Sequence, residues 1–117
     1  YYQKGFKDEM VKDIIHFIEE NYQDKIQLKD LVEYTNYSES TINTRLKDIL
    51  GTTFNQYLNQ FRIHKAVEAL EKDPNLNLQV LSSDVGIPNY KHFYQVFKKY
   101  TEYTPKQYVL NLRRELR

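Results

Sequence analysis

Two stretches of this 117-residue sequence carry amide, hydroxyl and amine groups at the spacing of one face of a helix. Their members are Ser40, Thr41, Asn43, Thr44 and Lys47 in the first stretch, and Tyr90, Lys91, Tyr94, Gln95 and Lys98 in the second. Asparagine and glutamine amides can bond bidentately to adenine, lysine suits the guanine edge, and threonine methyls can contact the thymine methyl. These side chains therefore fit the chemistry of reading base edges, provided that a helix presents them outwards.

A polar helix face also has a simpler interpretation, because most such faces are merely solvated. The residue types leave both interpretations open, and the elements that hold the residues must decide between them. If the first face reads bases, its small polar groups favour A·T pairs. Guanine is bonded most often by arginine or lysine, and positions 40, 43 and 44 hold neither.

Other kinds of chemistry find little support in the sequence. The chain has no cysteine, and His16, His64 and His92 fall on three different predicted helices without carboxylates at ligand spacing. There is no Gly-rich phosphate loop, no Ser/His/Asp grouping and no paired-carboxylate pattern. We therefore expect no metal, no cofactor and no enzymatic activity.

An internal repeat organises the chain. Segments 26–31 and 76–81 match in their apolar positions at an offset of 50, and Asn36 then meets Gly86, two residue types that tolerate a positive φ. After one inserted residue the offset becomes 51. The pairs at this offset are Ile42 and Phe93, Leu46 and Phe97, Lys47 and Lys98, Thr53 and Thr104, Gln56 and Gln107, and Tyr57 and Tyr108. These matches indicate two copies of one structural unit.

Hydrophobic periodicity predicts an all-α fold of about seven helices, and the scarcity of glycine and proline, three of each, argues against a loop-rich β fold. The predicted helices are 8–22, 27–35, 39–50, 54–72, 78–85, 90–101 and 105–115. The residues that we expect to be buried on the two polar-faced helices are Ile42, Leu46, Ile49 and Leu50 on 39–50, and Phe93, Val96, Phe97 and Tyr100 on 90–101.

Each repeat consists of a short helix, a tight turn and a second capped helix, which is the helix-turn-helix pattern. Ser38 is the expected N-cap of the helix 39–50. Capping boxes are expected where Thr53 precedes Gln56 and where Thr104 precedes Gln107. The predicted domain organisation is a linker from a missing upstream domain at 1–7, a first helix-turn-helix subdomain at 8–51, a connecting helix at 52–73 and a second helix-turn-helix subdomain at 74–117.

The long helix 54–72 has a mechanical consequence. At 1.5 Å per residue its roughly 19 residues span about 28 Å. With the packing of a subdomain at either end, it can hold two recognition helices about one DNA turn apart, roughly 34 Å. Arg62 on this helix can either touch a phosphate or brace the helix through an ion pair, and we favour the brace.

Charge is distributed unevenly, although the net charge is only +1. Residues 1–37 carry a balance of −3 and residues 38–88 one of −1, whereas residues 89–117 carry +5. This asymmetry indicates an anionic partner for the C-terminal part. No apolar run approaches the roughly 20 residues of a membrane helix. The absence of cysteine and of a signal peptide predicts a cytoplasmic protein, and a start at Tyr1 suggests a fragment of a longer one.

Several of these residues form a recognisable pattern. They are Arg62, Ile63 and Ala66 in the long helix, Gly86 at the second turn, the run 93–99 (FYQVFKK), and Thr104, Pro105 and Tyr108 after it. In this pattern the chain resembles the DNA-binding domain of the AraC/XylS family of bacterial transcription regulators, from about residue 8 to 112. It departs from the usual family pattern at Val32, Ser82, Ile87, Glu102 and Val109. Glu102, where glycine is usual, affects the loop geometry most directly.

The resemblance implies sequence-specific binding of promoter DNA, with two recognition helices in successive major grooves. The residues expected to contact bases are Ser40, Asn43, Thr44, Tyr90, Lys91, Tyr94 and Gln95. The residues expected to contact phosphates, at helix N-termini or beside the groove, are Gln27, Thr41, Lys47, Thr53, Asn77, Lys98, Lys99, Thr104 and Lys106. We expect the second unit to supply more of the phosphate-driven affinity and the first a weaker readout of A·T pairs.

The expected partners are double-stranded DNA, RNA polymerase that the domain recruits or obstructs, and a second subunit held through the missing upstream domain. We expect no membrane partner and a location at the nucleoid. The alternative is a helical protein-interaction module that kept the fold and lost its DNA contacts. The acidic balance of residues 1–37 motivates this alternative.

Overall fold

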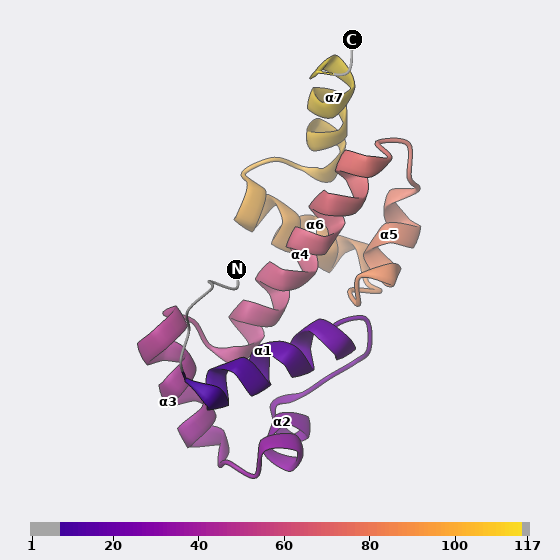
Figure 1. Cartoon of the computed structure of the whole chain (residues 1–117). Coiled ribbons are helices and arrows are strands. Elements are labelled where there is room, and N and C mark those ends of the chain that lie inside the picture. The colour runs from indigo at the N-terminus through magenta and orange to yellow at the C-terminus, as the bar shows by residue number, and fades with distance from the viewer. Residues whose placement is uncertain (1–7, 116–117) are drawn as a thin grey trace. The chain divides into compact units, whose positions relative to one another are not determined.

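A computed structural model describes residues 8–115, which form seven α-helices and no strand (Figure 1). The helices are α1 (Glu9–Asn21), α2 (Leu28–Thr35), α3 (Glu39–Leu50), α4 (Phe54–Lys72), α5 (Leu78–Asp84), α6 (Tyr90–Thr101) and α7 (Pro105–Glu115). The all-α prediction is confirmed, because each predicted range matches one of these helices to within a residue at either end. The linker expected at 1–7 lies outside the described residues.

The chain divides into two compact units, Tyr1–Leu58 and Asn59–Arg117. The division falls inside α4, so each unit contains part of the helix that the sequence suggests as a connector. The first unit holds α1, α2 and α3, and the second holds α5, α6 and α7. Each unit therefore contains one complete copy of the repeat.

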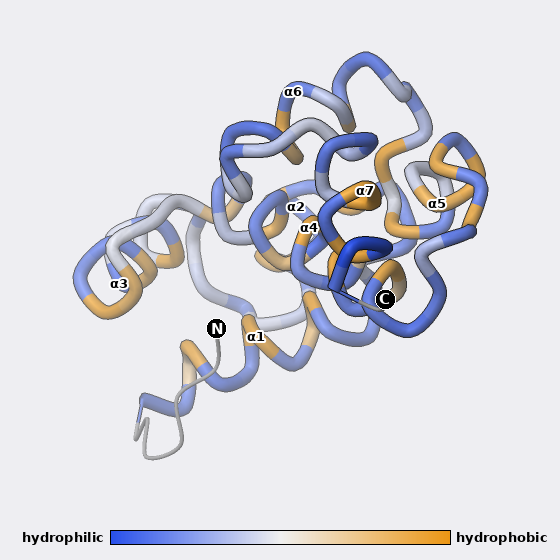
Figure 2. Tube along the Cα trace, turned by 90° about the horizontal axis from the view of Figure 1, so that it is seen from above, coloured by the Kyte–Doolittle hydropathy of each residue, from blue (hydrophilic) through white to orange (hydrophobic). Residues whose placement is uncertain are grey.

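The core of the first unit forms where α1 packs on both α2 and α3. The side chains that fill it, each at most 2% exposed, are Val11, Ile14, Ile15 and Ile18 of α1, Leu31 of α2, and Ile42 and Leu46 of α3. Figure 2 shows apolar and polar residues alternating along the helices, as one-sided burial requires. Ile49 and Leu50 of α3, which we expected in the core, are only half-buried because they lie at the end of the helix.

The core of the second unit is aromatic. The rings of Phe93 and Phe97 lie 5.6 Å apart, and Phe97 meets the ring of Tyr108 edge-on, also at 5.6 Å. Phe93 and Phe97 are completely buried. The helix that carries them, α6, packs on both α5 and α7. Tyr100, which we expected to be buried, is half-buried near the end of α6.

Four of the residues within 8–115 adopt the left-handed backbone region, and they occupy aligned positions of the repeat. Asn36 at φ 63° and Gly86 at φ 91° make the turns inside the two helix-turn-helix units. Gly51 at φ 74° ends α3, and Glu102 at φ 71° ends α6. The chain therefore keeps the usual loop geometry at 102 although a side chain replaces glycine there, at an expected cost of about 1 kcal/mol.

Candidate nucleic-acid interface

The first helix-turn-helix unit comprises α2, a turn at Asn36 and α3. Asn36 donates its N–H to the carbonyl of Val32, which ends α2, and Ser38 then begins α3 by accepting the N–H of Thr41 at 3.1 Å. Because Ile42 and Leu46 are completely buried, the opposite face of α3 must point away from the core. The sequence-predicted cap and turn are confirmed in this unit.

Most of the α3 residues that were predicted to contact bases or phosphates lie on its exposed face. The exposed members are Ser40, Thr41, Thr44 and Lys47. Asn43 is half-buried, and its Oδ1 is buried without a hydrogen-bond partner among the described residues. A bidentate bond to adenine uses both the oxygen and the nitrogen of the amide. Asn43 must therefore change rotamer before it can read adenine, whereas Thr44 needs no such movement.

The second helix-turn-helix unit comprises α5, a turn at Gly86 and α6. Ser82, where the family usually has alanine, is completely buried, and its hydroxyl donates to the carbonyl of Ile87. The N–H of Ile87 returns a hydrogen bond of 2.9 Å to the carbonyl of Ser82, so the two residues clamp the turn from both sides. Asn89 then begins α6 by accepting the N–H of His92 at 3.0 Å.

Side chains on α6 form a longer-reaching and more basic face. Its exposed members are Lys91, Tyr94, Gln95, Lys98 and Lys99. Tyr90 is half-buried with its ring 5.9 Å from Phe93, and burial, followed by the nearby Tyr94, raises the pKa of its phenol. Tyr90 therefore lies at the edge of the core, with part of its side chain still exposed.

The capping boxes predicted at the two later helices are both present. At α4, the Thr53 N–H donates to the amide oxygen of Gln56 at 3.0 Å, and the Gln56 N–H donates to the Thr53 hydroxyl at 3.3 Å. At α7, Thr104 and Gln107 make the same pair of bonds at 2.9 and 3.1 Å. Pro105, the first residue of α7, has no N–H to offer a ligand. The next residue, Lys106, is exposed and brings both a backbone N–H and a cationic side chain to the N-terminus of α7.

The N-termini of α2 and α5 differ in charge. Gln27 donates its N–H to the carboxylate of Asp30 at 2.7 Å, which places a negative charge at the start of α2. Asn77 caps α5 with a neutral amide that accepts the N–H groups of Gln79 and Val80 at 2.9 and 3.1 Å. A phosphate at the start of α2 would meet the Asp30 carboxylate, whereas one at the start of α5 would meet no such charge.

Arg62 is a buried polar residue of the core, with only 9% of its surface exposed. Burial lowers the pKa of its guanidinium. With so little of the residue exposed, its place in the core fits the bracing role better than the phosphate contact. The ion pair that we expected for it remains a prediction.

Two further side chains on α3 and α6 lie outside the predicted contact set. Arg45 of α3 forms an ion pair with Asp8, the N-cap of α1, and thus ties α3 to α1. His92 is exposed in the first turn of α6, beside Lys91. Its position next to a predicted reader was the available signal, but the histidines were considered only as metal ligands.

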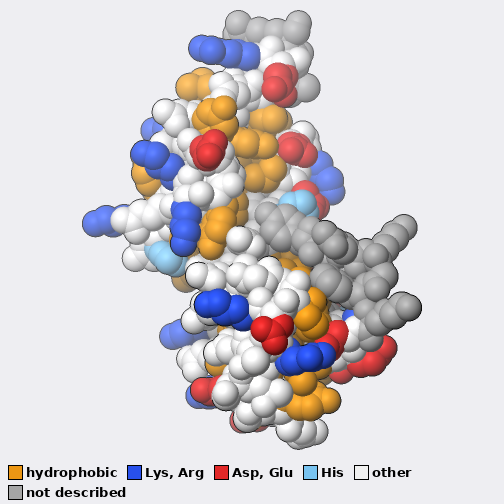
Figure 3. All heavy atoms as spheres, turned by 90° about the vertical axis from the view of Figure 1, so that its left-hand side faces the viewer, with side chains coloured by type: hydrophobic (Ala, Val, Ile, Leu, Met, Phe, Trp, Pro, Cys, Tyr) orange, Lys and Arg blue, Asp and Glu red, His pale blue; other side chains and the backbone are white. Residues whose placement is uncertain are grey.

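The face of the molecule drawn in Figure 3 carries both basic and acidic side chains. On the face that Figure 3 shows, Lys and Arg lie at separate points with Asp and Glu among them. No group of three His, Cys, Asp or Glu residues that could hold a metal ion occurs within residues 8–115. Among the helices described here, none has the length and apolarity needed to cross a membrane.

Comparison with known proteins gives concordant matches. Residues 31–111 match the family model of a helix-turn-helix domain. The transcriptional regulatory protein HptR of Staphylococcus aureus is 32% identical over 103 residues, which are 88% of this chain and 40% of that protein. The xylose operon regulatory protein of Haemophilus influenzae is 26% identical over 108 residues, 92% of this chain and 28% of that protein. The chain thus spans less than half the length of these relatives.

Solved structures with the same fold include two domains of response regulators. The C-terminal domain of AraT from Geobacillus stearothermophilus superposes with a TM-score of 0.83 at 25% identity, covering 89% of this chain and 86% of that one. The C-terminal domain of yesN from Fusobacterium nucleatum gives a TM-score of 0.78 at 32% identity, covering 87% and 99%.

The fold and the matches define a helix-turn-helix DNA-binding domain of the kind found in bacterial transcription regulators. The chain belongs to the AraC/XylS family of helix-turn-helix DNA-binding domains. The resemblance deduced from the residue pattern is confirmed.

Proposed function

We propose that this domain binds promoter DNA sequence-specifically by placing α3 and α6 in successive major grooves, over roughly 20 base pairs. The observation that carries the proposal is the repetition. The helices α3 and α6 each bury an apolar side and expose a polar side, at aligned positions of the two repeats. A single polar face can be solvated by chance, but two aligned ones on capped helices fit a common ligand with a repeating structure.

The proposed roles divide the polar side chains into base contacts and phosphate contacts, as the sequence predicted them. Bases are read by Ser40, Asn43 and Thr44 from α3, and by Tyr90, Lys91, Tyr94 and Gln95 from α6. Phosphates are held by Gln27, Thr41, Lys47, Thr53, Asn77, Lys98, Lys99, Thr104 and Lys106. Phosphate contacts set the register and most of the salt-dependent affinity, whereas base contacts distinguish sequences.

Selection from a randomised DNA library, followed by mobility-shift titration of the best site against scrambled DNA, tests this function. Specific sites are expected to bind at least about 10³-fold more tightly than scrambled DNA at physiological salt. A domain whose selected sites never exceed random DNA is not a sequence-specific reader.

A salt series on the selected site identifies the phosphate contacts. Because each contact releases about 0.9 counterion, Lys98→Ala is expected to reduce the slope of log affinity against log salt by about 0.9. Lys29→Ala serves as the matched control, because Lys29 is an exposed lysine outside the proposed contact set. Equal slopes for both variants would remove Lys98 from the phosphate contacts.

The finer biological setting belongs to the same proposal. We infer a cytoplasmic regulator that acts on RNA polymerase at promoters and dimerises through an upstream domain. The exposed acidic residues of α1, which include Glu9, Asp13, Glu19 and Glu20, are the feature that favours the alternative of a protein-interaction module. Charge reversal of Lys91 and Lys98 separates the two, because only a DNA reader should lose nucleic-acid affinity.

A further inference from the structure

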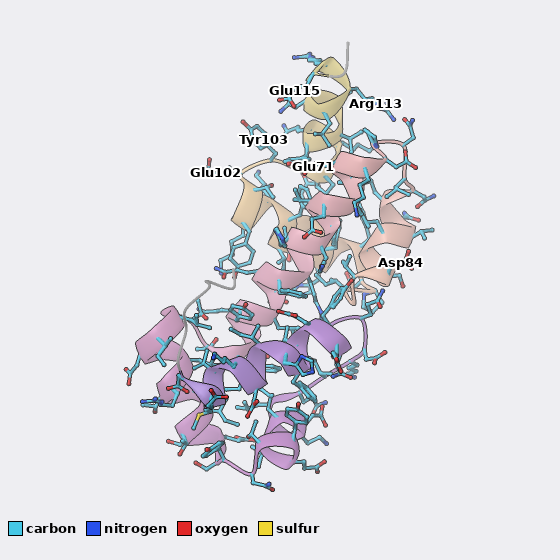
Figure 4. All side chains as sticks on the ribbon, viewed as in Figure 1. Glu71, Asp84, Glu102, Tyr103, Arg113 and Glu115 are labelled. Carbon is cyan, nitrogen blue, oxygen red and sulfur yellow. The ribbon has the colours of Figure 1, made fainter. Side chains whose placement is uncertain are left out.

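A pocket of about 290 Å³ lies along one side of α7 in the second unit. It is lined by Glu71 of the last turn of α4, Tyr103 of the loop before α7, and Tyr108, Asn111, Leu112 and Glu115 of α7. The four α7 residues follow the i, i+3, i+4, i+7 spacing of a single helix face. Figure 4 shows Tyr103, Glu71 and Glu115 toward one side of α7 and Arg113 on the other.

The two tyrosines and the two carboxylates act on one another. The Tyr108 hydroxyl donates to Oε1 of Glu71 at 3.4 Å, and the rings of Tyr103 and Tyr108 lie 6.4 Å apart at 66°. Burial, then Glu71, and then Glu115 raise the pKa of the Tyr108 phenol. Both carboxylates line the pocket together with the Tyr108 ring, while Tyr103 remains 45% exposed.

The sign of this charge is opposite to that of its surroundings. Residues 89–117 carry a balance of +5, yet none of the described residues that line this pocket is basic. Arg113, which follows Leu112 in the sequence, donates instead to Asn75 at 2.9 Å and lines a separate groove with Lys106. DNA is an anion, so the proposed function does not use this pocket.

We propose that the pocket binds an organic cation, either an alkylammonium or a guanidinium group. Tyr103 and Tyr108 supply aromatic rings, which attract cations through their quadrupoles, and Glu71 and Glu115 supply carboxylate acceptors. Leu112 provides apolar surface for the carbon stem, and the Asn111 amide can accept a further hydrogen bond. The cation is either a free amine or the basic side chain of a protein partner.

NMR titration of the 117-residue chain with N-acetylarginine amide tests the proposal, with the neutral N-acetylglutamine amide as the matched probe. Saturable shifts are expected at Tyr103, Tyr108 and Leu112 for the arginine compound alone. The bound cation should also lower the pKa of the Tyr108 phenol, because a positive charge stabilises the phenolate. A parallel titration with spermidine distinguishes the two sources of the cation. Tighter binding of spermidine indicates a free amine, and tighter binding of N-acetylarginine amide indicates a protein side chain.

Variants locate the site. Each of Glu71→Gln and Tyr103→Leu is expected to weaken binding about two- to fivefold. Glu39→Gln, which changes an exposed carboxylate in the first unit, is expected to leave it unchanged. Equal shifts with the neutral probe, or unchanged affinity in both Glu71→Gln and Glu115→Gln, would overturn the proposal. DNA affinity should be retained in these variants, because none of them changes a proposed DNA contact. The cation site and the proposed function can therefore be disproved separately.

Discussion

Ser40, Asn43 and Thr44 of α3 align with Lys91, Tyr94 and Gln95 of α6, so three matched positions carry short side chains in one unit and long ones in the other. Charge differs in the same way. The two acidic and two basic residues of α3 cancel, whereas α6 has three lysines and no acidic residue. Two copies of one fold can thus divide the work, with reach and charge concentrated in the second.

The helix ends repeat this inequality. The start of α2 carries the Asp30 carboxylate, whereas the aligned position in α5 is Val80. The end of α3 has Gly51 in the left-handed region, whereas the end of α6 has Glu102 in the same conformation. The two units therefore share a backbone conformation at these helix ends but differ in the charge and the type of the side chain there.

The largest expected effect concerns the two cores at the aligned positions Leu46 and Phe97, both completely buried. Phe97→Ala should lower the free energy of unfolding by about 3–5 kcal/mol. Leu46→Ala should cost about 1 kcal/mol less, since it removes no contact like those of Phe97 with Phe93 and Tyr108. Urea denaturation of both variants measures the difference, and a costlier Leu46→Ala contradicts it.

The next effect concerns DNA affinity. Lys91→Ala or Gln95→Ala should weaken binding to the selected site by about 1–3 kcal/mol, which is about 5- to 150-fold. Asn43→Ala or Thr44→Ala should weaken it less, because Asn43 must first expose its oxygen and Thr44 has a short reach. Mobility shifts at fixed salt rank the four variants, and the reverse order would end the proposed division between the units.

A smaller effect tests the two left-handed helix ends. Glu102→Gly should raise the free energy of unfolding by about 1 kcal/mol, and Gly51→Ala should lower it by a similar amount. No atom lies within 4 Å of a Cβ added at Gly51, so backbone strain alone sets that cost. Thermal or urea unfolding gives both values. The changes in the free energy of unfolding should have opposite signs for the two variants, and equal signs would contradict the prediction.

The smallest effect concerns Asp30. Asp30→Asn removes the negative charge from the start of α2 while keeping an oxygen that can accept the Gln27 N–H. DNA affinity at low salt should rise by about 0.3–1 kcal/mol, because helix-end charge effects have this size. Val80→Asn in the second unit is the matched control, since it removes no charge. An unchanged affinity would show that no phosphate approaches Gln27.

Much of this molecule could be predicted from its residues. The seven helices, the positive φ at Asn36 and Gly86, and the capping boxes at Thr53 and Thr104 all follow from local chemistry. Exposure of the two polar faces follows from the apolar stripes behind them. Burial of a given end residue did not follow, and Ile49, Leu50 and Tyr100 are less buried than expected, since helix ends extend past the core.

By itself, therefore, the sequence determined the helices, the repeat and the family, because caps, periodicity and turn residues act between near neighbours in the chain. Only the tertiary structure decided which partners distant residues find. It buried Oδ1 of Asn43, paired Arg45 with Asp8, satisfied Ser82 through Ile87, and brought Glu71 to Tyr108 from 37 residues away. Such contacts depend on how helices pack, and packing is set by the whole core rather than by any local pattern.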